Sequence, residues 1–254
     1  MSLPIKDQIV IVSGAGRGLG ASIAAAFALE GAKVAINYRS SRAQAEALAA
    51  ELGDRARAFQ ADIRSLAETE RLVADVTAHF GAPTTVVHNA LADFSFNGDA
   101  RSKLDALSWT EMSTQLETAL QGALNLIQAA RPAMAAAGFG RIVTIGTNLF
   151  QNPVVPYHDY TAAKAALLSL TRTAAAELGP LGITVNMVSG GLLRTTDASS
   201  ATPEAVFDII AANTPLRRVT TPEEASDAVL FFASPWARAV TGQNLIVDGG
   251  LVFG

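Results

Sequence analysis

The stretch Ser13-Gly14-Ala15-Gly16-Arg17-Gly18-Leu19-Gly20 decides the fold. It continues directly from the apolar run Ile9–Ser13, and the alanine-rich segment Ala21–Glu30 begins where it ends. Glycines between a buried strand and a helix allow a tight turn and a close approach of the backbone to a ligand. The helix N-terminus then offers free N–H groups to phosphate. The stretch therefore predicts a strand–turn–helix unit that binds the diphosphate of a dinucleotide.

The same alternation of β-rich and helix-like segments continues to the end of the chain. The further predicted strands are Lys33–Tyr38, Arg57–Ala61, Thr85–His88, Arg141–Ile145, Thr184–Val188 and Asn244–Val247. Helices are predicted at Ala43–Leu52, Leu66–Phe80 and Thr161–Leu178, and helix ends at Gly31, Gly53, Gly81 and Gly182. Several strands are apolar at consecutive positions, which indicates burial on both faces.

This pattern predicts one α/β domain over residues 1–254, a doubly wound parallel sheet of the Rossmann type with helices on both faces. The irregular stretches Leu91–Ser108 and Leu192–Thr202 are long for loops of a compact domain, so we expect them to border the substrate. They carry no residue pattern that names that substrate.

Composition narrows the class of protein. The net charge of -4 gives no reason to expect nucleic acid or an anionic membrane as a partner. No apolar run is long enough for a membrane span, and the first residues lack the features of a signal peptide, so we expect a soluble cytoplasmic protein. The absence of cysteine excludes disulfides and thiolate chemistry. The histidines His79, His88 and His158 are scattered without metal-ligand spacing, so no metal site is predicted.

The end of the second predicted strand, Asn37-Tyr38-Arg39-Ser40, carries no acid. A carboxylate there would bind the adenosine ribose and repel a 2′-phosphate. Arg39 can instead pair with that phosphate, with Ser40 adding a hydroxyl and Arg17 approaching from the glycine turn. A single arginine is usually a solvated surface charge, but two flanking one pocket favour NADP(H) over NAD(H) as cofactor.

The third predicted strand is followed by Asp62 and Ile63, which we assign to the same cofactor pocket. The Asp62 carboxylate can accept a hydrogen bond from the adenine amino group. A local role, as a helix cap or turn former, is nearly as well supported by the sequence.

Tyr160 and Lys164 lie four residues apart in a predicted helix and can point into the same cleft. An ammonium near a phenol lowers its pKa and makes it a better acid–base group. Thr147 ends the strand before that helix, where open α/β sheets bind ligands, and its hydroxyl can polarise a carbonyl. The spacing alone is common by chance. His158 and Asp159 precede Tyr160 and could touch the substrate, but we expect them on a solvent-exposed turn.

Together with these residues, three further motifs give the chain a resemblance to the short-chain dehydrogenase/reductase family over essentially its whole length. They are His88-Asn89-Ala90, Asn186-Met187-Val188-Ser189-Gly190-Gly191 with Thr195, and Thr241-Gly242-Gln243-Asn244-Leu245-Ile246-Val247-Asp248-Gly249-Gly250. The chain is most similar in character to the bacterial 3-oxoacyl-carrier-protein reductase type.

This resemblance implies hydride transfer between nicotinamide and a carbonyl or alcohol carbon. Tyr160 would exchange the proton, Lys164 would bind the nicotinamide ribose and lower the tyrosine pKa, and Thr147 would stand in for the usual serine. Asn89 and Ala90 would line the cofactor pocket. Gly190 would belong to the same pocket, and Thr195 would contact the nicotinamide or diphosphate. The resemblance also implies a homotetramer, with the apolar helix Thr161–Leu178 in a dimer interface.

Three positions depart from the family pattern. Ala119 replaces an asparagine that supports a water in the proton path, Leu91 replaces a glycine, and Gly190 replaces a proline. These departures leave alternatives beside a general NADP(H)-dependent oxidoreductase of small carbonyl or alcohol compounds. One is a 3-oxoacyl-[acyl-carrier-protein] reductase, although the expected basic docking residues are largely missing. Another is a nucleotide-binding sensor or structural subunit with little turnover.

Overall fold

The computed structural model describes residues 2–92, 94 and 96–253. Seven strands of this part of the chain form one parallel sheet in the order β3-β2-β1-β4-β5-β6-β7. Their bounds are β1 Ile9–Val12, β2 Lys33–Tyr38, β3 Ala56–Gln60, β4 Thr85–His88, β5 Gly140–Thr147, β6 Ile183–Gly190 and β7 Asn244–Val247. The predicted doubly wound parallel sheet is confirmed.

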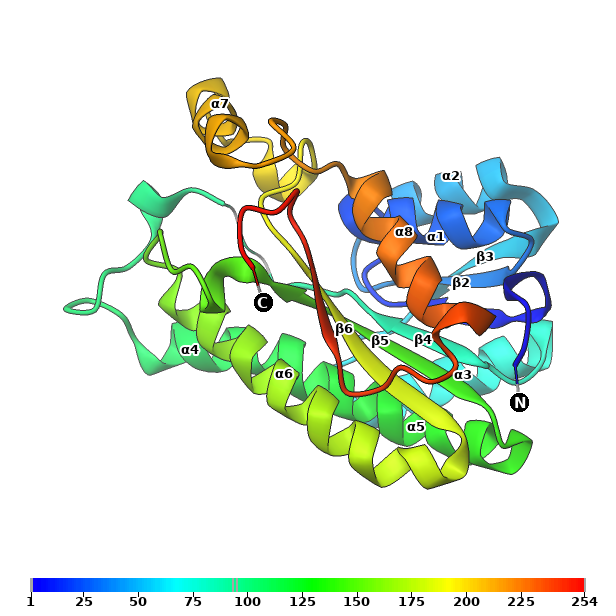
Figure 1. Ribbon diagram of the computed structural model, residues 1–254. Helices are drawn as coiled ribbons and strands as arrows, with labels where there is room; N and C mark the ends of the chain where they lie inside the picture. Colours follow the sequence, from blue (N-terminus) through cyan, green and yellow to red (C-terminus); the bar gives the residue numbers. More distant parts are fainter. Residues whose placement is uncertain (1, 93, 95, 254) are drawn as a thin grey trace.

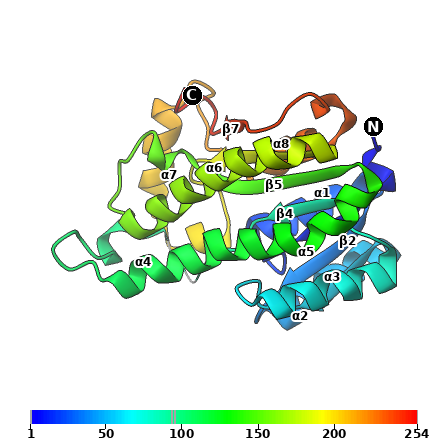
Figure 2. The same ribbon diagram turned by 90° about the horizontal axis from the view of Figure 1, so that it is seen from below.

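Helices cover both faces of the sheet (Figures 1 and 2). On one face lie α1 Gly18–Leu29, α2 Arg42–Leu52 and α8 Pro222–Ala233. On the other lie α3 Leu66–Phe80, α5 Gly122–Ala137 and α6 His158–Leu178, with α4 Trp109–Leu116 joined to α5 by a π-helical turn, Glu117–Gln121. Along β1, Val10 and Val12 pack into the first core and Ile11 into the second. The strand is therefore buried on both faces, as its consecutive apolar residues predict.

The order of the strands reverses at β1, which pairs with β2 on one side and with β4 on the other. Crossovers to the two sides carry the chain over opposite faces, so a crevice opens beyond the carboxyl ends of these two strands. The glycine turn lies at this switch point, directly after β1.

Most predicted element bounds agree with the structure to within three residues, and β2, β4, β7 and α3 agree in full. Strands β5 and β6 are longer than predicted because they pair in register as far as Thr147 and Gly190. Helix α6 begins at His158, earlier than predicted, so Tyr160 lies inside its first turn. Gly31, Gly53, Gly81 and Gly182 all have positive φ at or just beyond helix ends.

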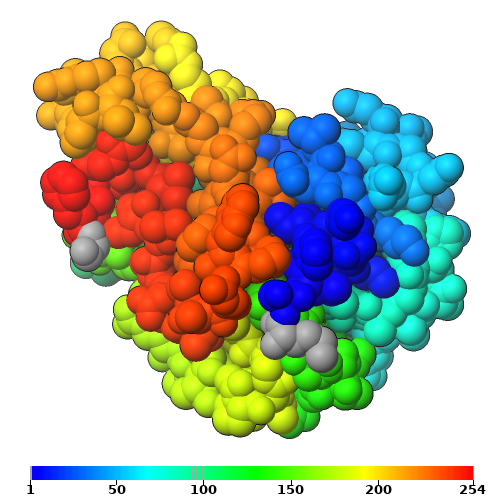
Figure 3. Space-filling model, turned by 45° about the vertical axis from the view of Figure 1, so that its right-hand side comes forward, coloured from blue at the N-terminus to red at the C-terminus, as the bar shows by residue number. Residues whose placement is uncertain are grey.

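Two irregular segments lie at the same end of the sheet as the glycine turn: the loop between β4 and α4, and the segment between β6 and α7 Glu204–Asn213 (Figure 1). In the space-filling view, α7 stands out from the body of the molecule above the C-terminal segment (Figure 3). No helix within the described ranges has both the length and the apolar character that crossing a membrane requires.

Candidate active site

A cavity of about 590 Å³ opens at the carboxyl ends of the central strands, a volume typical of ligand pockets. It brings together most of the residues that the sequence assigns to cofactor and substrate. These are Gly14, Arg17, Gly18, Leu19, Gly20, Tyr38, Arg39, Ser40, Asp62, Ile63, Asn89, Ala90, Tyr160, Lys164 and Gly190. The predicted cofactor end and the predicted catalytic end therefore belong to one continuous cleft.

The glycine turn is held against the end of β4. A side chain at Gly14 would place its Cβ 2.8 Å from the Cα of Ala90, and φ at Gly14 is +62°, so only glycine fits. The Ser13 hydroxyl accepts hydrogen bonds from the backbone N–H groups of Asn89 and Ala90, both at 3.1 Å. Ser13 therefore supports the turn from behind and does not line the cleft. Gly16 does not line it either, because it packs against Ser41.

His88 also helps to hold the glycine turn in place, a role that the sequence analysis did not assign to it. Its Nε2 lies 2.9 Å from the carbonyl of Ala119, which can only accept, so Nε2 carries the proton. Nδ1 is then an acceptor for the Ser13 hydroxyl at 3.3 Å. Burial and, to a smaller extent, the nearby charge of Lys164 together lower the pKa of His88 to about 3. A neutral histidine thus ties the glycine turn to the π-helical turn that contains Ala119.

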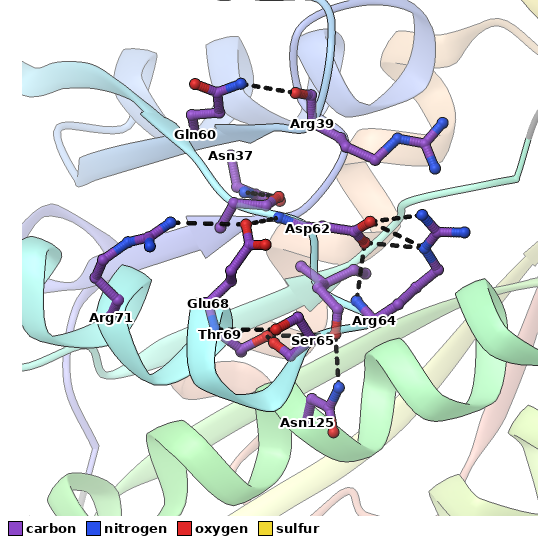
Figure 4. A network of polar contacts seen from close by, with 12 residues as sticks. Asn37, Arg39, Gln60, Asp62, Arg64, Ser65, Glu68, Thr69, Arg71 and Asn125 are labelled. Atoms are coloured by element: carbon purple, nitrogen blue, oxygen red, sulfur yellow. Dashed lines mark hydrogen bonds and ion pairs between the residues drawn. The ribbon is translucent and has the colours of Figure 1, made fainter.

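At the adenosine end, Asp62 is engaged by a neighbour that the sequence analysis did not single out (Figure 4). Nη2 of Arg64 donates to Oδ2 of Asp62 at 2.6 Å, and Nε donates to Oδ1 at 3.0 Å. The backbone N–H of Arg64 also donates to Oδ1, which is the turn-forming role that the sequence left open. These bonds from Arg64 lower the pKa of Asp62. The adenine contact of Asp62 stays a prediction.

Arg64 lines the cleft together with Arg39, and Figure 4 shows both side chains extending to the same side of Asp62. Arg39 and Ser40 are exposed at the end of β2, where they are free to meet a ligand from solvent. Within the described residues, the cleft wall at this point carries no carboxylate except Asp62, which is paired. This charge pattern fits an anionic group on the adenosine side.

Arg17 reaches across the cleft to the segment after β6, where its Nε lies 3.6 Å from Oδ2 of Asp197. Both side chains are more than half exposed, so the pair is weak. In the same segment, Thr195 is exposed and does not line the cleft, whereas Thr196 does. The structure thus favours Thr196 as the hydroxyl next to the glycine turn, and it lies 3.6 Å from where a Cβ at Gly18 would be.

The predicted catalytic residues meet where β5 ends and α6 begins. The Tyr160 hydroxyl is hydrogen-bonded to the hydroxyl of Thr147, and Tyr160 is only 6% exposed. Nζ of Lys164 lies 5.7 Å from the centre of the Tyr160 ring and donates to the carbonyl of Ile145 at 2.7 Å. Thr147 is buried behind the tyrosine and does not itself line the cleft.

The electrostatics at this point correct one expectation. Burial raises the pKa of Tyr160 to about 12, although the hydrogen bond from Thr147 acts in the opposite direction. The sequence analysis expected Lys164 to lower this pKa, whereas the net shift in this structure is upward because removing the phenolate from water is the largest effect. Burial also lowers the pKa of Lys164, to about 8. Tyr160 therefore remains a neutral phenol at pH 7, the form that donates a proton.

Asp159 is not on an exposed turn, as the sequence suggested. It lies in the first turn of α6, is 2% exposed, and forms an ion pair with Arg101 from the loop between β4 and α4. The Arg101 guanidinium lies 4.5 Å from the ring centre of Phe94, which stacks on Tyr160 at 4.8 Å. A charged pair and an aromatic contact thus fix this loop beside the reacting hydroxyl, and no helix periodicity could have revealed it.

Ala119, which replaces the asparagine of the family pattern, lies in the π-helical turn Glu117–Gln121. Such turns are often found at functional sites. Its neighbour Thr118 lines the cleft, and the Thr118 hydroxyl oxygen is buried without a hydrogen-bond partner. The turn therefore holds a buried, unpaired hydroxyl beside the cleft, one residue away from the position of the missing asparagine.

The C-terminal segment supports the catalytic strand from the other side. Asn148, which follows Thr147, donates through Nδ2 to Oδ2 of Asp248 at 2.9 Å, and both residues are buried. The same carboxylate accepts the backbone N–H groups of Gly250 and Val252. The end of β5 is thus fastened to the residues after β7.

Histidine and acidic side chains do not gather anywhere in the described part of the chain as a group of three that could hold a metal ion. The cleft instead combines a phosphate-binding turn, a tyrosine phenol and a buried lysine. This is a donor set suited to a dinucleotide and to proton transfer.

Comparisons with known proteins agree with this geometry. Residues 14–252 match the family model described as Enoyl-(Acyl carrier protein) reductase. The chain is 32% identical over 248 residues to a 3-oxoacyl-[acyl-carrier-protein] reductase of Staphylococcus epidermidis, covering 96% of this chain and 99% of the relative. It is 34% identical over 255 residues to a 3-alpha-(or 20-beta)-hydroxysteroid dehydrogenase of Mycobacterium tuberculosis, covering 100% of this chain and 93% of the relative.

Solved structures show the same likeness. A crystal structure of a dehydrogenase/reductase from Sinorhizobium meliloti 1021 superposes with a TM-score of 0.86 at 30% identity, covering 99% of this chain and 97% of the other. The match spans the glycine turn, the switch point and the Tyr160 end of the cleft alike. The chain therefore belongs to the short-chain dehydrogenase/reductase family, oxidoreductases that act on CH–OH and C=O groups.

Proposed function

We propose that the protein is an NADP(H)-dependent reductase of small carbonyl compounds that also works in reverse as an alcohol dehydrogenase. The observation that carries the proposal is that Tyr160, with Thr147 behind it and Lys164 beside it, faces the same cleft as the glycine turn. A bound nicotinamide cofactor supplies or accepts the hydride. The chain's own residues then have to place the carbonyl and move one proton.

Tyr160 is suited to donate that proton in the direction of reduction. Its raised pKa keeps the phenol protonated at pH 7, and an alkoxide that forms on the substrate is a stronger base than the phenolate left behind. Thr147 holds the Tyr160 hydroxyl in place through a hydrogen bond. Lys164, largely protonated at pH 7, offers an ammonium to stabilise the phenolate and to bind a ribose hydroxyl.

The preference for NADP(H) is supported by the basic end of the cleft. Arg39 and Ser40 follow the end of β2 and line the cleft together with Arg17 of the glycine turn, and the two acids of the described lining, Asp62 and Asp197, are paired with arginines. We expect tighter binding of NADPH than of NADH, and Arg39→Ala to weaken NADPH about 10- to 100-fold while changing NADH little, since a charge-assisted hydrogen bond is lost. Arg55→Ala, whose guanidinium bonds the Gly31 carbonyl away from the cleft, is the matched control.

Fluorescence titration of both cofactors, combined with an NADPH-oxidation screen over ketones, quinones and 3-oxoacyl thioesters, tests the proposal. Equal affinities of the wild type for the two cofactors would contradict the NADP(H) preference. Tight NADPH binding with no oxidation of NADPH across the whole screen would instead support a nucleotide-binding sensor or structural subunit. Ala119 in the π-helical turn is the observation that favours that second candidate.

We further propose a homotetramer that acts in the cytoplasm on free small molecules rather than on substrates attached to acyl carrier protein. An acidic carrier needs a basic dock near the mouth of the cleft. Reductases that receive substrate from such a carrier tend to have basic residues before β5 and just ahead of the glutamate late in α6, whereas here the segment 133–140 carries no charge and Ala174-Ala175-Ala176 precedes Glu177. Arg131, Arg141 and Arg172 are the remaining basic residues in this region, and Arg141 is buried against Phe139.

A further inference from the structure

The wall of the cleft nearest Tyr160 is built from aromatic rings. Phe94 stacks on Tyr160 with ring centres 4.8 Å apart and planes inclined by 30°. Phe96 meets the same tyrosine edge to face at 5.7 Å, and Tyr157 packs edge to face on Phe94 at 5.2 Å. Phe94 and Phe96 also line the cavity, so they contact both the reacting residue and whatever enters.

Aliphatic side chains also line the cavity. They are Leu91, Ala92, Leu193 and Ala198, and the backbone N–H of Phe96 donates to the carbonyl of Ala198 at 3.0 Å. Leu91 and Phe96 belong to the same apolar cluster as Phe94, Tyr157 and Tyr160, which Leu149 and Val155 complete. This surface offers dispersion and ring contacts to a substrate but few hydrogen bonds.

Cations near this wall are already engaged. Arg101 pairs with the buried Asp159 and lies over Phe94, and it does not line the cavity. Nζ of Lys164 is bonded to the Ile145 carbonyl. The lining arginines Arg17, Arg39 and Arg64 belong to the glycine turn and to the ends of β2 and β3. A carboxylate or phosphate on the substrate would therefore meet no available arginine among the described residues around Tyr160.

We propose that the substrate is an uncharged, flat, ring-containing ketone, and that Phe94 is the residue that selects it. The inference rests on the proposed function. Hydride adds to the ring carbonyl carbon, the Tyr160 proton adds to the carbonyl oxygen, and the products are the cyclic secondary alcohol and the oxidised cofactor. Tyr160 stacks on the Phe94 ring and the Arg101 guanidinium lies over it, so the part of Phe94 that lines the cavity is a rigid wall beside the reacting hydroxyl, against which a flat substrate can lie.

A flexible, linear ketone gains less binding free energy from such a wall than a rigid ring does. A linear ketone must give up rotational freedom to lie against rigid rings, whereas a fused ring system has none to lose. Aromatic pairs also stabilise each other beyond the area that they bury. The wall therefore discriminates between substrates of equal carbon number by shape rather than by hydrophobicity.

The test compares β-tetralone with methyl octyl ketone, which contain the same number of carbon atoms, as substrates with saturating NADPH. We expect kcat/KM for β-tetralone to be about tenfold higher. Phe94→Leu also removes the ring that packs on Tyr160, so the ratio of the two kcat/KM values is the quantity that reports selection, and we expect this ratio to fall about 2- to 10-fold. Phe231→Leu on α8, outside the cavity, is the matched control and should change neither value.

Calorimetric titration of β-tetralone into the NADP⁺-saturated protein separates this inference from the proposed function. If neither ketone is reduced but β-tetralone binds with a Kd that Phe94→Leu weakens, the reductase proposal fails and the aromatic site stands. The inference is overturned if methyl octyl ketone, or a short 3-oxoacyl thioester, is preferred. It is also overturned if Phe94→Leu affects the two ketones equally, or if β-tetralone neither binds nor reacts.

Discussion

Two residues at the cleft, Tyr160 and Lys164, have functions that involve charge, whereas their burial disfavours their charged forms. Tyr160 has to exchange a proton with a substrate, yet burial under Phe94 moves its pKa to about 12. Lys164 has to remain charged, yet burial moves its pKa to about 8. Each shift comes from lost hydration, so the cleft favours neutral forms of both groups. Catalysis then depends on contacts that stabilise charge only when the transition state forms.

Replacing Tyr160 by phenylalanine removes only the hydroxyl, so the aromatic packing and the cofactor cleft should persist. We expect kcat to fall about 10²- to 10⁴-fold, the usual worth of a general acid, with the Kd of NADPH within about twofold of the wild type. Stopped-flow kinetics and fluorescence titration measure the two quantities. Tyr157→Phe in the same aromatic cluster is the control, and a Tyr160→Phe enzyme that kept most of its activity would show that another group donates the proton.

His88 should make stability depend on pH. The unfolded chain binds a proton at its ordinary pKa near 6.5, whereas the folded imidazole stays neutral down to about 3. Below pH 6.5 the unfolded state therefore binds more protons, and the free energy of unfolding should fall by up to about 1.4 kcal/mol per pH unit as the pH is lowered.

Chemical denaturation of wild type and His88→Gln across this range isolates the effect, because acidic groups contribute equally to both proteins. The difference in stability between the two should shrink steadily as the pH falls from about 6.5 toward 4. A constant difference would mean that His88 is already charged, or already hydrated, in the folded protein.

The sequence predicts features that lie within a single element better than it predicts contacts between elements. The strand ends and the glycine turn were predictable because periodicity and φ preferences are local, as at Gly14 and α3. Contacts between segments that are far apart in the chain were not predictable from the sequence. The Arg101–Asp159 pair joins an irregular loop to a helix, and the bond from His88 to Ala119 joins a strand end to a π-helical turn.

The loop between β4 and α4 gives the element-scale prediction. Arg101→Met leaves Asp159 buried in α6 without its partner, which should destabilise the protein by up to about 3–5 kcal/mol at neutral pH. Asp159→Asn in the same background should restore part of the loss, because a neutral amide costs less to bury. Thermal unfolding of the single and double variants measures both effects. Additive losses would mean that the two residues do not interact in solution.

At the scale of the whole molecule, one face of helix α6 is exposed in the single chain. Leu167, Ala174 and Leu178 face the core, but Ala165 and Ala176 on the opposite side are exposed in the single chain. The sheet can bury only one face of a helix, so we expect a second copy to cover the other. Light scattering should give about four times the chain mass of 26.4 kDa, and Ala165→Glu should shift the particle toward smaller species. A 26.4 kDa particle at micromolar concentration would contradict the assembly.

The hydrogen bond between Asn148 and Asp248 limits where the protein can be tagged, fused or shortened. The described residues after β7 form no helix or strand, yet the Asp248 carboxylate accepts a hydrogen bond from the residue next to Thr147. A purification tag, a fusion partner or a truncation placed after Val247 would therefore act on the geometry of the reacting hydroxyls rather than on a free end. Affinity handles belong at the other terminus, which emerges at the opposite end of the sheet (Figure 1).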